Sequence, residues 1–254
     1  MSDQAGSIAV AAATQSDTPT LEATLQQKRL ALGLISGCHV LNHLQYSITS
    51  VIFPVMMTEL GFGLVGLGFI SALSSFVGQG LQVIYGFLSN FFRRTTMLAL
   101  GNVMVGLTAM AQYFVGSFPQ LVTARVAIDA GSSPQHPLGS SLLSRYYPKA
   151  RGWALTFHHS AGNLGSFLGP AAASLALLYV GWRTAFVIFG SLSLLMGLTL
   201  FLCPITAAKA SLLPERRKPA QDLMLTSNVS KIAICFLLLW CSWPGRQDEA
   251  PALI

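Results

Sequence analysis

The sequence predicts an all-α membrane protein whose core is a bundle of six transmembrane helices. Two observations carry this prediction. Only 9% of the 254 residues are charged and the mean hydropathy is +0.58, whereas soluble domains carry about 25% charged residues. Between residues 31 and 208 the charges are also confined to a few short breaks. The apolar stretches between these breaks are long enough to cross a hydrocarbon layer of about 30 Å, which takes about 20 helical residues.

The breaks place the six helices in order along the chain. Gly61 and Gly63 form a turn after the first helix, and Pro119 opens the fourth. Gly181 precedes the sixth helix and Pro204 ends it, since glycine and proline are the usual residues of turns and helix ends. We therefore expect the helices at residues 30–57, 64–90, 95–115, 120–146, 152–180 and 184–203.

The two ends of the chain differ in composition from this 30–203 bundle. Residues 1–29 are polar and typical of a flexible cytoplasmic tail, and residues 204–230 predict a charged cytoplasmic linker. The apolar run at 231–241 is too short to cross a bilayer. It is either a re-entrant or interfacial segment, or a seventh helix that has been cut short. The second interpretation makes the chain a truncated product and residues 242–254 a polar, non-native tail.

Basic residues predict the orientation of the bundle. Arg183 stands alone on one side of the six-helix arrangement, and Lys and Arg near span ends are held on the cytoplasmic side. We therefore expect a multi-pass protein of the plasma (inner) membrane with a cytoplasmic amino terminus. The net charge of +6 then faces anionic lipid headgroups, and no nucleic-acid motif accompanies it. The residues on the cytoplasmic side are Lys28, Arg29, Arg93, Arg94, Arg145, Lys149, Arg151, Lys209, Arg216, Arg217 and Lys218.

Cysteine spacing and catalytic motifs argue against a metalloprotein or an enzyme. Cys38, Cys203, Cys235 and Cys241 lie in or beside apolar stretches without the spacing of a zinc site or a disulfide framework. No HExxH or GxSxG motif is present. We therefore expect no cofactor and no metal ion. The sequence leaves open a membrane-embedded enzyme that uses the histidines and a membrane scaffold that transports nothing.

Several motifs resemble those of the major facilitator superfamily, whose members have two six-helix halves. Residues 86–94, from Gly86 to Arg93 and Arg94, resemble its cytoplasmic signature, although Asn90 stands where the family has an acid. Arg93 and Arg94 either take part in gating or only anchor the cytoplasmic end of the helix. Arg125 stands where the family places its intramembrane arginine. The resemblance implies a secondary active transporter, of which this chain supplies one six-helix half and a truncated seventh helix.

Two further stretches resemble the fosmidomycin-resistance branch of efflux transporters. His136 and Pro137 lie in a Gly-rich fourth helix, and Gly162 and Asn163 lie in the fifth. The Gly165-x-x-x-Gly169-Pro170 pattern is similar to a motif of antiporters in the same superfamily. These resemblances imply proton-coupled efflux of small organic molecules or drugs. If the chain is truncated, it needs a second six-helix half or self-association.

Polar residues within the spans are the candidate path for solute and protons. A charge at the bilayer centre costs at least about 2.5–3.5 kcal/mol, so each one indicates a partner or a watery cavity. With a rise of about 1.5 Å per residue, the candidates fall into two layers, roughly 9–13 Å and 17–24 Å from the cytoplasmic side. Transporters place their sites near the midplane. The candidates are His39, Asn42, His43, Arg125, Asp129, His136, His158 and Asn163.

Each candidate also has a purely structural interpretation. Arg125 and Asp129 are one helical turn apart and predict an internal ion pair. Alternatively, Asp129 carries a proton and releases Arg125 for an anionic substrate. The histidines, including His159, either titrate or bond a neighbouring helix as neutral imidazoles.

Proline and glycine positions predict a break and a close helix contact. Pro134 and Pro137 each remove a backbone hydrogen bond, so we expect a broken, cavity-lining segment in the fourth helix. Gly165, Gly169 and Pro170 predict close packing and a bend of the fifth helix, rather than contact with substrate.

Overall fold

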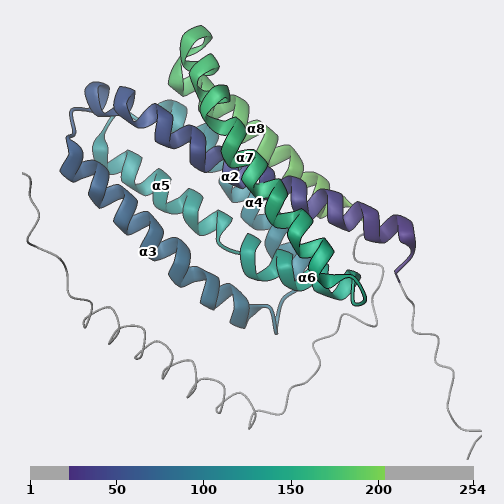
Figure 1. The fold of residues 1–254 in the computed structure, drawn as a ribbon. Helices are drawn as coiled ribbons and strands as arrows, with labels where there is room; N and C mark the ends of the chain where they lie inside the picture. Colours follow the sequence, from purple (N-terminus) through teal and green to yellow (C-terminus); the bar gives the residue numbers. More distant parts are fainter. Residues whose placement is uncertain (1–22, 204–254) are drawn as a thin grey trace, which may run out of the picture. The chain divides into compact units, whose positions relative to one another are not determined.

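The computed structural model describes residues 23–203, and in that part of the chain all regular secondary structure is helical. The all-α fold with six helical rods is therefore confirmed for these residues (Figure 1). The rods are α2 (Leu25–Leu60), α3 (Leu64–Leu88), α4 (Arg94–Ala111) with the short 3₁₀-helix η1 (Gln112–Phe114), α5 (Phe118–Ser132) with the π-helix η2 (Gln135–Gly139) and α6 (Ser140–Tyr146), α7 (Arg151–Tyr179) and α8 (Gly181–Leu202).

Most of the terminal segments assigned from the sequence lie outside the described residues. These are the first 22 residues, the predicted linker at 204–230, the partial seventh helix at 231–241 and the polar tail at 242–254. The helical part begins inside the stretch that was expected to be a tail. Helix α2 starts at Leu25 because Thr24 and Gln27 form a capping box, with backbone-to-side-chain distances of 3.3 Å and 2.9 Å.

The fourth rod is interrupted where Pro134 and Pro137 predict a break. Helix α5 ends at Ser132, and the chain continues through the π-helix η2 before the short helix α6. Pro134 and Pro137 remove two backbone N–H donors within four residues, which disfavours a regular α-helical ladder through this stretch. Single-turn π segments are rare and often lie at functional sites. Here the π-helix buries Gln135 and places the exposed His136 at the wall of a cavity.

Glycines allow two pairs of helices to pack closely. Helix α2 packs most extensively against α7, and α4 against α8. A Cβ atom at Gly165 of α7 would lie 2.2 Å from the carbonyl oxygen of Val40, and one at Gly106 of α4 would lie 2.5 Å from the amide nitrogen of Leu194. Only glycine fits at such distances, as in the close helix contacts of membrane proteins. Pro170 lies inside α7 without ending the helix.

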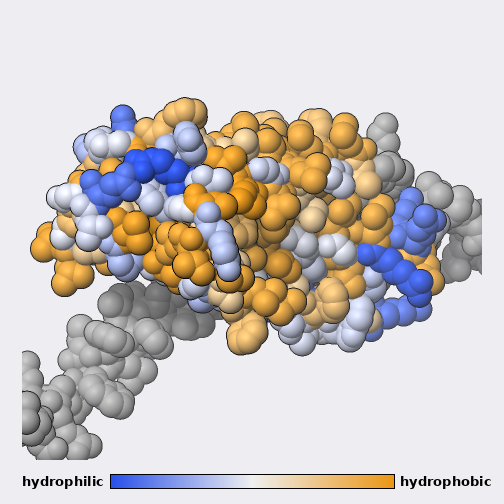
Figure 2. Space-filling model, turned by 90° about the horizontal axis from the view of Figure 1, so that it is seen from above, coloured by the Kyte–Doolittle hydropathy of each residue, from blue (hydrophilic) through white to orange (hydrophobic). Residues whose placement is uncertain are grey.

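The outer surface of the described rods is strongly apolar. Figure 2 shows hydrophobic residues across the middle of the visible face, with hydrophilic residues gathered toward its two ends. Val65 is 90% exposed, and Phe76 and Phe167 are each 79% exposed. Among the described residues, four helices are long and apolar enough to cross a membrane: Leu64–Leu88, Arg94–Phe114, Arg151–Tyr179 and Gly181–Leu202. Helix α2 and the interrupted fourth rod carry eight of the fourteen buried polar or charged residues in the described part of the chain.

Two buried apolar clusters lie on either side of these polar groups along α2. One cluster includes Ile35 and Cys38, and the other includes Ile48 and Ile52. The residues between them on α2 include His39, and Asp129 of α5 and Gln135 of η2 line the same cavity as His39. The fold therefore holds a polar layer between two apolar ones.

Candidate functional site

All five histidines of the chain gather in the polar layer. His39 and His43 stand on successive turns of α2, His136 on η2, and His158 and His159 on α7. The ring centre of His39 lies 4.6 Å from that of His43, 5.0 Å from that of His136 and 4.1 Å from that of His158. The similar depths estimated from the sequence for His39, His136 and His158 thus correspond to direct proximity in space. His43, which was placed in the deeper layer, lies beside them.

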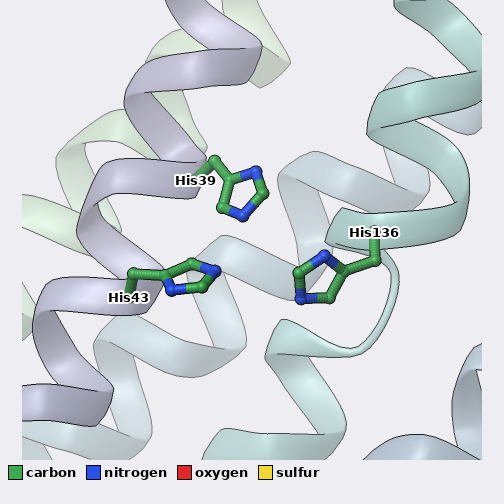
Figure 3. Close-up of side chains that lie close together, drawn as sticks. All are labelled: His39, His43 and His136. Atoms are coloured by element: carbon green, nitrogen blue, oxygen red, sulfur yellow. The ribbon is translucent and has the colours of Figure 1, made fainter. Parts of the chain in front are cut away.

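Hydrogen bonds fix the orientation of three of these rings. His39 Nδ1 lies 2.6 Å from His158 Nε2, and His158 Nδ1 lies 3.4 Å from the hydroxyl of Ser36. His43 Nδ1 lies 3.0 Å from the hydroxyl of Ser166 on α7. These bonds use the Nδ1 atoms of His39 and His43, so their Nε2 atoms remain for other partners. Figure 3 shows the rings of His39 and His43 directed across a gap toward His136.

A buried ion pair on α5 forms the second part of the site. Arg125 Nη2 lies 3.3 Å from Asp129 Oδ1, and the two side chains are 5% and 10% exposed. Arg125 Nη1 also donates to the hydroxyl of Thr49 at 3.1 Å, and its guanidinium carbon lies 5.6 Å from the ring centre of Tyr46. The internal ion pair predicted from the one-turn spacing is therefore present, and it is tied to α2.

Two neighbouring cavities open onto these groups. The first has a volume of about 220 Å³ and is lined by five of the predicted residues: His39, Asn42, His43, Asp129 and His136. The second, of about 260 Å³, is lined by the Arg125–Asp129 pair together with Tyr46 and Thr49. Because Asp129 lines both cavities, a change in its charge acts on both.

Several buried polar atoms at the first cavity lack a hydrogen-bond partner within the described part of the chain. Both side-chain polar atoms of Asn42, the hydroxyl of Ser74 and Oε1 of Gln135 are in this position. Gln135 is held in place, since its Nε2 donates to the carbonyl of Ile35 at 2.8 Å. Buried polar groups are normally hydrogen-bonded, so these atoms are available to an occupant of the cavity. Sequence reasoning missed Ser74 and Gln135, whose only signal was polarity inside an apolar span.

The predicted residues of α7 divide between two faces of that helix. His158 is fully buried against His39. Asn163 is exposed and lines neither of the two cavities. Gly165 and Gly169 face α2, where an added Cβ would meet atoms of that helix at 2.2 Å and 2.4 Å. These two glycines therefore serve helix packing.

The residues of the predicted cytoplasmic motif lie at the ends of α3 and α4, away from the cavities. Gly86 is near the end of α3 and Asn90 is exposed just beyond it. Arg93 occupies the N-cap position of α4. Arg94 donates to the hydroxyl of Ser141, which joins the start of α4 to α6.

A polar network at the end of α2 remote from the amino terminus was not expected from the sequence. Trp182 Nε1 donates to Glu59 Oε2 at 2.5 Å, and Arg183 forms an ion pair with the same carboxylate. Arg183 also donates to the carbonyls of Tyr113 and Val115 at 3.1 Å and 3.0 Å. The hydrogen bond from Trp182, followed by that from Arg183, holds the pKa of Glu59 below its ordinary value. The isolated basic charge of Arg183 was the one feature of the sequence that could have indicated this network.

Known proteins match the chain over most of its length. The Major Facilitator Superfamily matches residues 35–245. The probable sulfoacetate transporter SauU of Cupriavidus necator is 23% identical over 171 residues, which cover 67% of this chain and 40% of that protein. The fosmidomycin resistance protein of Escherichia coli is 28% identical over 152 residues, which cover 59% of this chain and 37% of that protein.

Solved structures show the same fold. A bacterial homologue of the human lysosomal transporter Spinster, in an inward-facing and occupied conformation, matches with a TM-score of 0.62 at 18% identity, covering 71% of this chain and 45% of that one. The chain thus spans less than half the length of the relatives it matches. The probable L-galactonate transporter of Escherichia coli is 26% identical over 169 residues, which cover 66% of this chain and 37% of that protein. The relatives named for sulfoacetate and L-galactonate are transporters and not enzymes. The chain is a multi-pass membrane protein and belongs to the major facilitator superfamily.

Proposed function

We propose that the chain forms one six-helix half of a secondary active transporter for small organic anions, with transport coupled to protons. The observation that carries this proposal is the cavity at which His39, His43, His136 and Asp129 meet. Ionisable residues inside a membrane protein mark solute and ion paths. Transporters bind their solutes near the midplane, at the interface between structural repeats. A second six-helix unit would supply the remaining walls of the cavity.

Arg125 supports an anionic solute. Its guanidinium lines the second cavity, and its buried Nε has no hydrogen-bond partner within the described part of the chain. Guanidinium groups recognise carboxylates and related oxyanions through two parallel hydrogen bonds. Two relatives are named for organic anions, sulfoacetate and L-galactonate. We expect a solute of this chemical class to pair with Arg125.

Asp129 supports proton coupling. When ionised, its carboxylate satisfies Arg125 and competes with any anion for the same guanidinium. When protonated, it leaves the arginine to the solute, so proton and anion bind together. The buried position of both partners makes this competition strong, because water screens it little.

Export is the direction favoured by a separate observation. The chain is 28% identical to the fosmidomycin resistance protein and carries the Gly165-x-x-x-Gly169-Pro170 pattern. Joint binding of a proton and an anion favours a second candidate, in which both cross the membrane in the same direction. Export in exchange for protons and co-transport with protons therefore predict opposite directions of anion movement under the same pH gradient.

Flux in membrane vesicles tests the proposal. One set of vesicles carries the chain alone, and a second carries the chain joined to the carboxy-terminal half of the Escherichia coli L-galactonate transporter. We expect pH-gradient-driven flux of labelled sulfoacetate or galactonate in the joined protein, and loss of this flux in Asp129→Asn with normal membrane insertion. Glu59→Gln is the matched control, because it removes a carboxylate that lies outside the cavities. Unaltered flux in Asp129→Asn would refute the proton role, and absence of gradient-driven flux in both sets would refute the transport assignment.

The orientation expected from the basic residues is part of the same proposal. We propose that the protein lies in the plasma (inner) membrane with its amino terminus in the cytoplasm. The turns that carry Arg93 and Arg151 then face the cytoplasm, while Arg183 and its partner Glu59 lie at the opposite surface.

A further inference from the structure

The geometry points to a binding site for a divalent transition-metal ion, of the zinc type, formed by His39, His43 and His136. One ring nitrogen of each residue lies within 4.8 Å of the corresponding nitrogens of the other two. In a tetrahedral zinc site with Zn–N bonds of about 2.0–2.1 Å, the nitrogens are roughly 3.4 Å apart. Small side-chain rotations would close this difference, since His136 is exposed and not held by another hydrogen bond in the described part of the chain.

The hydrogen bonds of His39 and His43 suit metal binding through their Nε2 atoms. Histidines that bind metals normally use their second nitrogen to bond a neighbouring group, which fixes the ring orientation and the tautomer. His43 Nδ1 has Ser166 as this partner. The partner of His39 Nδ1 is His158 Nε2, which must then accept a hydrogen bond from the Nδ1–H group of His39. His158 therefore carries its own proton on Nδ1, which faces the hydroxyl of Ser36. One set of tautomers thus satisfies the whole chain of contacts.

Gly162 makes room for this arrangement. A Cβ atom at this position of α7 would lie 2.7 Å from both Cδ2 and Nε2 of His39, and 3.1 Å from Cδ2 of His43. Any larger residue would displace the two rings that point toward His136 in Figure 3. The close contact between α2 and α7 is therefore compatible with the histidine cluster only because the residue facing it is glycine.

The three histidines leave a coordination position open to the cavity. His39 is buried, His43 is half-buried and His136 is exposed, so the ligands lie across the wall of the first cavity. Three protein ligands with one open position are typical of zinc sites at which water or an anionic group completes the coordination. Imidazole suits zinc, copper and nickel rather than magnesium or calcium. A bound ion would join α2 to the π-helix η2. The site shares the first cavity with the proposed transport path. Its test requires no flux, so the two proposals can fail independently.

Metal titration of the full chain tests this proposal. The protein is purified in detergent without a histidine tag, and Zn²⁺ binding is measured by calorimetry. We expect one zinc ion per chain with a micromolar or lower dissociation constant. His43→Ala and His136→Ala should each abolish this binding, and His158→Ala should weaken it about 10–100-fold, as loss of an orienting partner does. Co²⁺ should give the visible absorption of a tetrahedral complex in the wild-type protein and in none of the triad variants.

Three controls distinguish zinc binding by this triad from zinc binding by other side chains. His159→Ala removes a histidine of the same cluster that does not belong to the triad, so zinc binding should persist. Replacement of all four cysteines by serine should also leave the affinity unchanged. Zinc should raise the unfolding temperature of the wild-type protein but not that of a folded His136→Gln variant. Absence of zinc binding to folded wild-type protein, equal loss in His159→Ala, or loss in the cysteine-free variant would each overturn the proposal.

Discussion

The contact between α2 and α7 provides a quantitative test of the fold. In Gly165→Ala the added methyl carbon would lie 2.2 Å from the carbonyl oxygen of Val40, 3.0 Å from its carbonyl carbon and 3.1 Å from the amide nitrogen of Leu44. Carbon–oxygen contacts in proteins are about 3.3 Å or longer, so the two helices must separate by roughly 1 Å. The obstructing atoms are backbone and cannot rotate away. We therefore expect destabilisation at the upper end of the about 1–3 kcal/mol typical of overpacking.

The assay is unfolding in mixed micelles by titration with sodium dodecyl sulfate, followed by tryptophan fluorescence. A loss of about 3 kcal/mol lowers the ratio of folded to unfolded protein roughly 100-fold. Gly33→Ala is the matched control on α2, because a Cβ atom there meets nothing within 4 Å. Alanine loses less conformational entropy than glycine when a helix forms, so Gly33→Ala should be more stable than the wild type by about 0.5–1 kcal/mol. If the two variants unfold at the same detergent fraction, the reasoning about the α2–α7 contact is refuted.

Further predictions concern the two ends of the bundle. Because Trp182 and Arg183 lower the pKa of Glu59, its carboxylate stabilises the fold above its unfolded pKa of about 4.3, and this contribution is lost as the pH falls through the lower folded pKa. Unfolding temperatures measured from neutral to acid pH should therefore fall less steeply in Glu59→Gln than in wild type, and parallel curves would contradict this account. Ser141→Ala, which removes the acceptor for Arg94, should destabilise the protein by about 0.5–1.5 kcal/mol in the detergent titration; a change no larger than that of Ser174→Ala, whose hydroxyl bonds only its own helix, would speak against the link. Single cysteines at Phe92 and Gly152 should be labelled from the same side of intact membranes by an impermeant maleimide, and labelling from opposite sides would rule out the proposed topology.

Helix positions were predictable because the breaks between the rods are marked by charges, glycines and prolines. Helix α3 begins at Leu64, as expected from the preceding glycines. The start of α2 was placed too late, since Lys28 and Arg29 mark where the apolar span begins and not where the helix begins. The capping box at Thr24 lies outside that span. Hydropathy therefore reports membrane depth, and capping residues report helix ends.

The sequence predicted how deep the site residues lie in the bundle, but not the directions in which their side chains point. A fixed helical rise placed His39 and His136 at matching levels, and the structure brings their rings together. The direction of a side chain on a helix changes by about 100° per residue, so an error of one residue in the helical register moves a side chain to another face of the helix. Asn163 shares the exposed face of His159 and not the buried face of His158. The position of Gln135 depends on the π-helix, whose register no periodic pattern predicts.

The central claim is that lipid surrounds the outer faces of the rods while the polar residues face a watery cavity. Spin labels at Leu195 and Ser75, placed one at a time in a cysteine-free protein in lipid vesicles, test it directly. Leu195 is 63% exposed on α8, and Ser75 lines the first cavity. We predict that the label at Leu195 is relaxed by oxygen and not by water-soluble chromium oxalate, and that the label at Ser75 shows the reverse. Equal relaxation of both labels by chromium oxalate would contradict the claim.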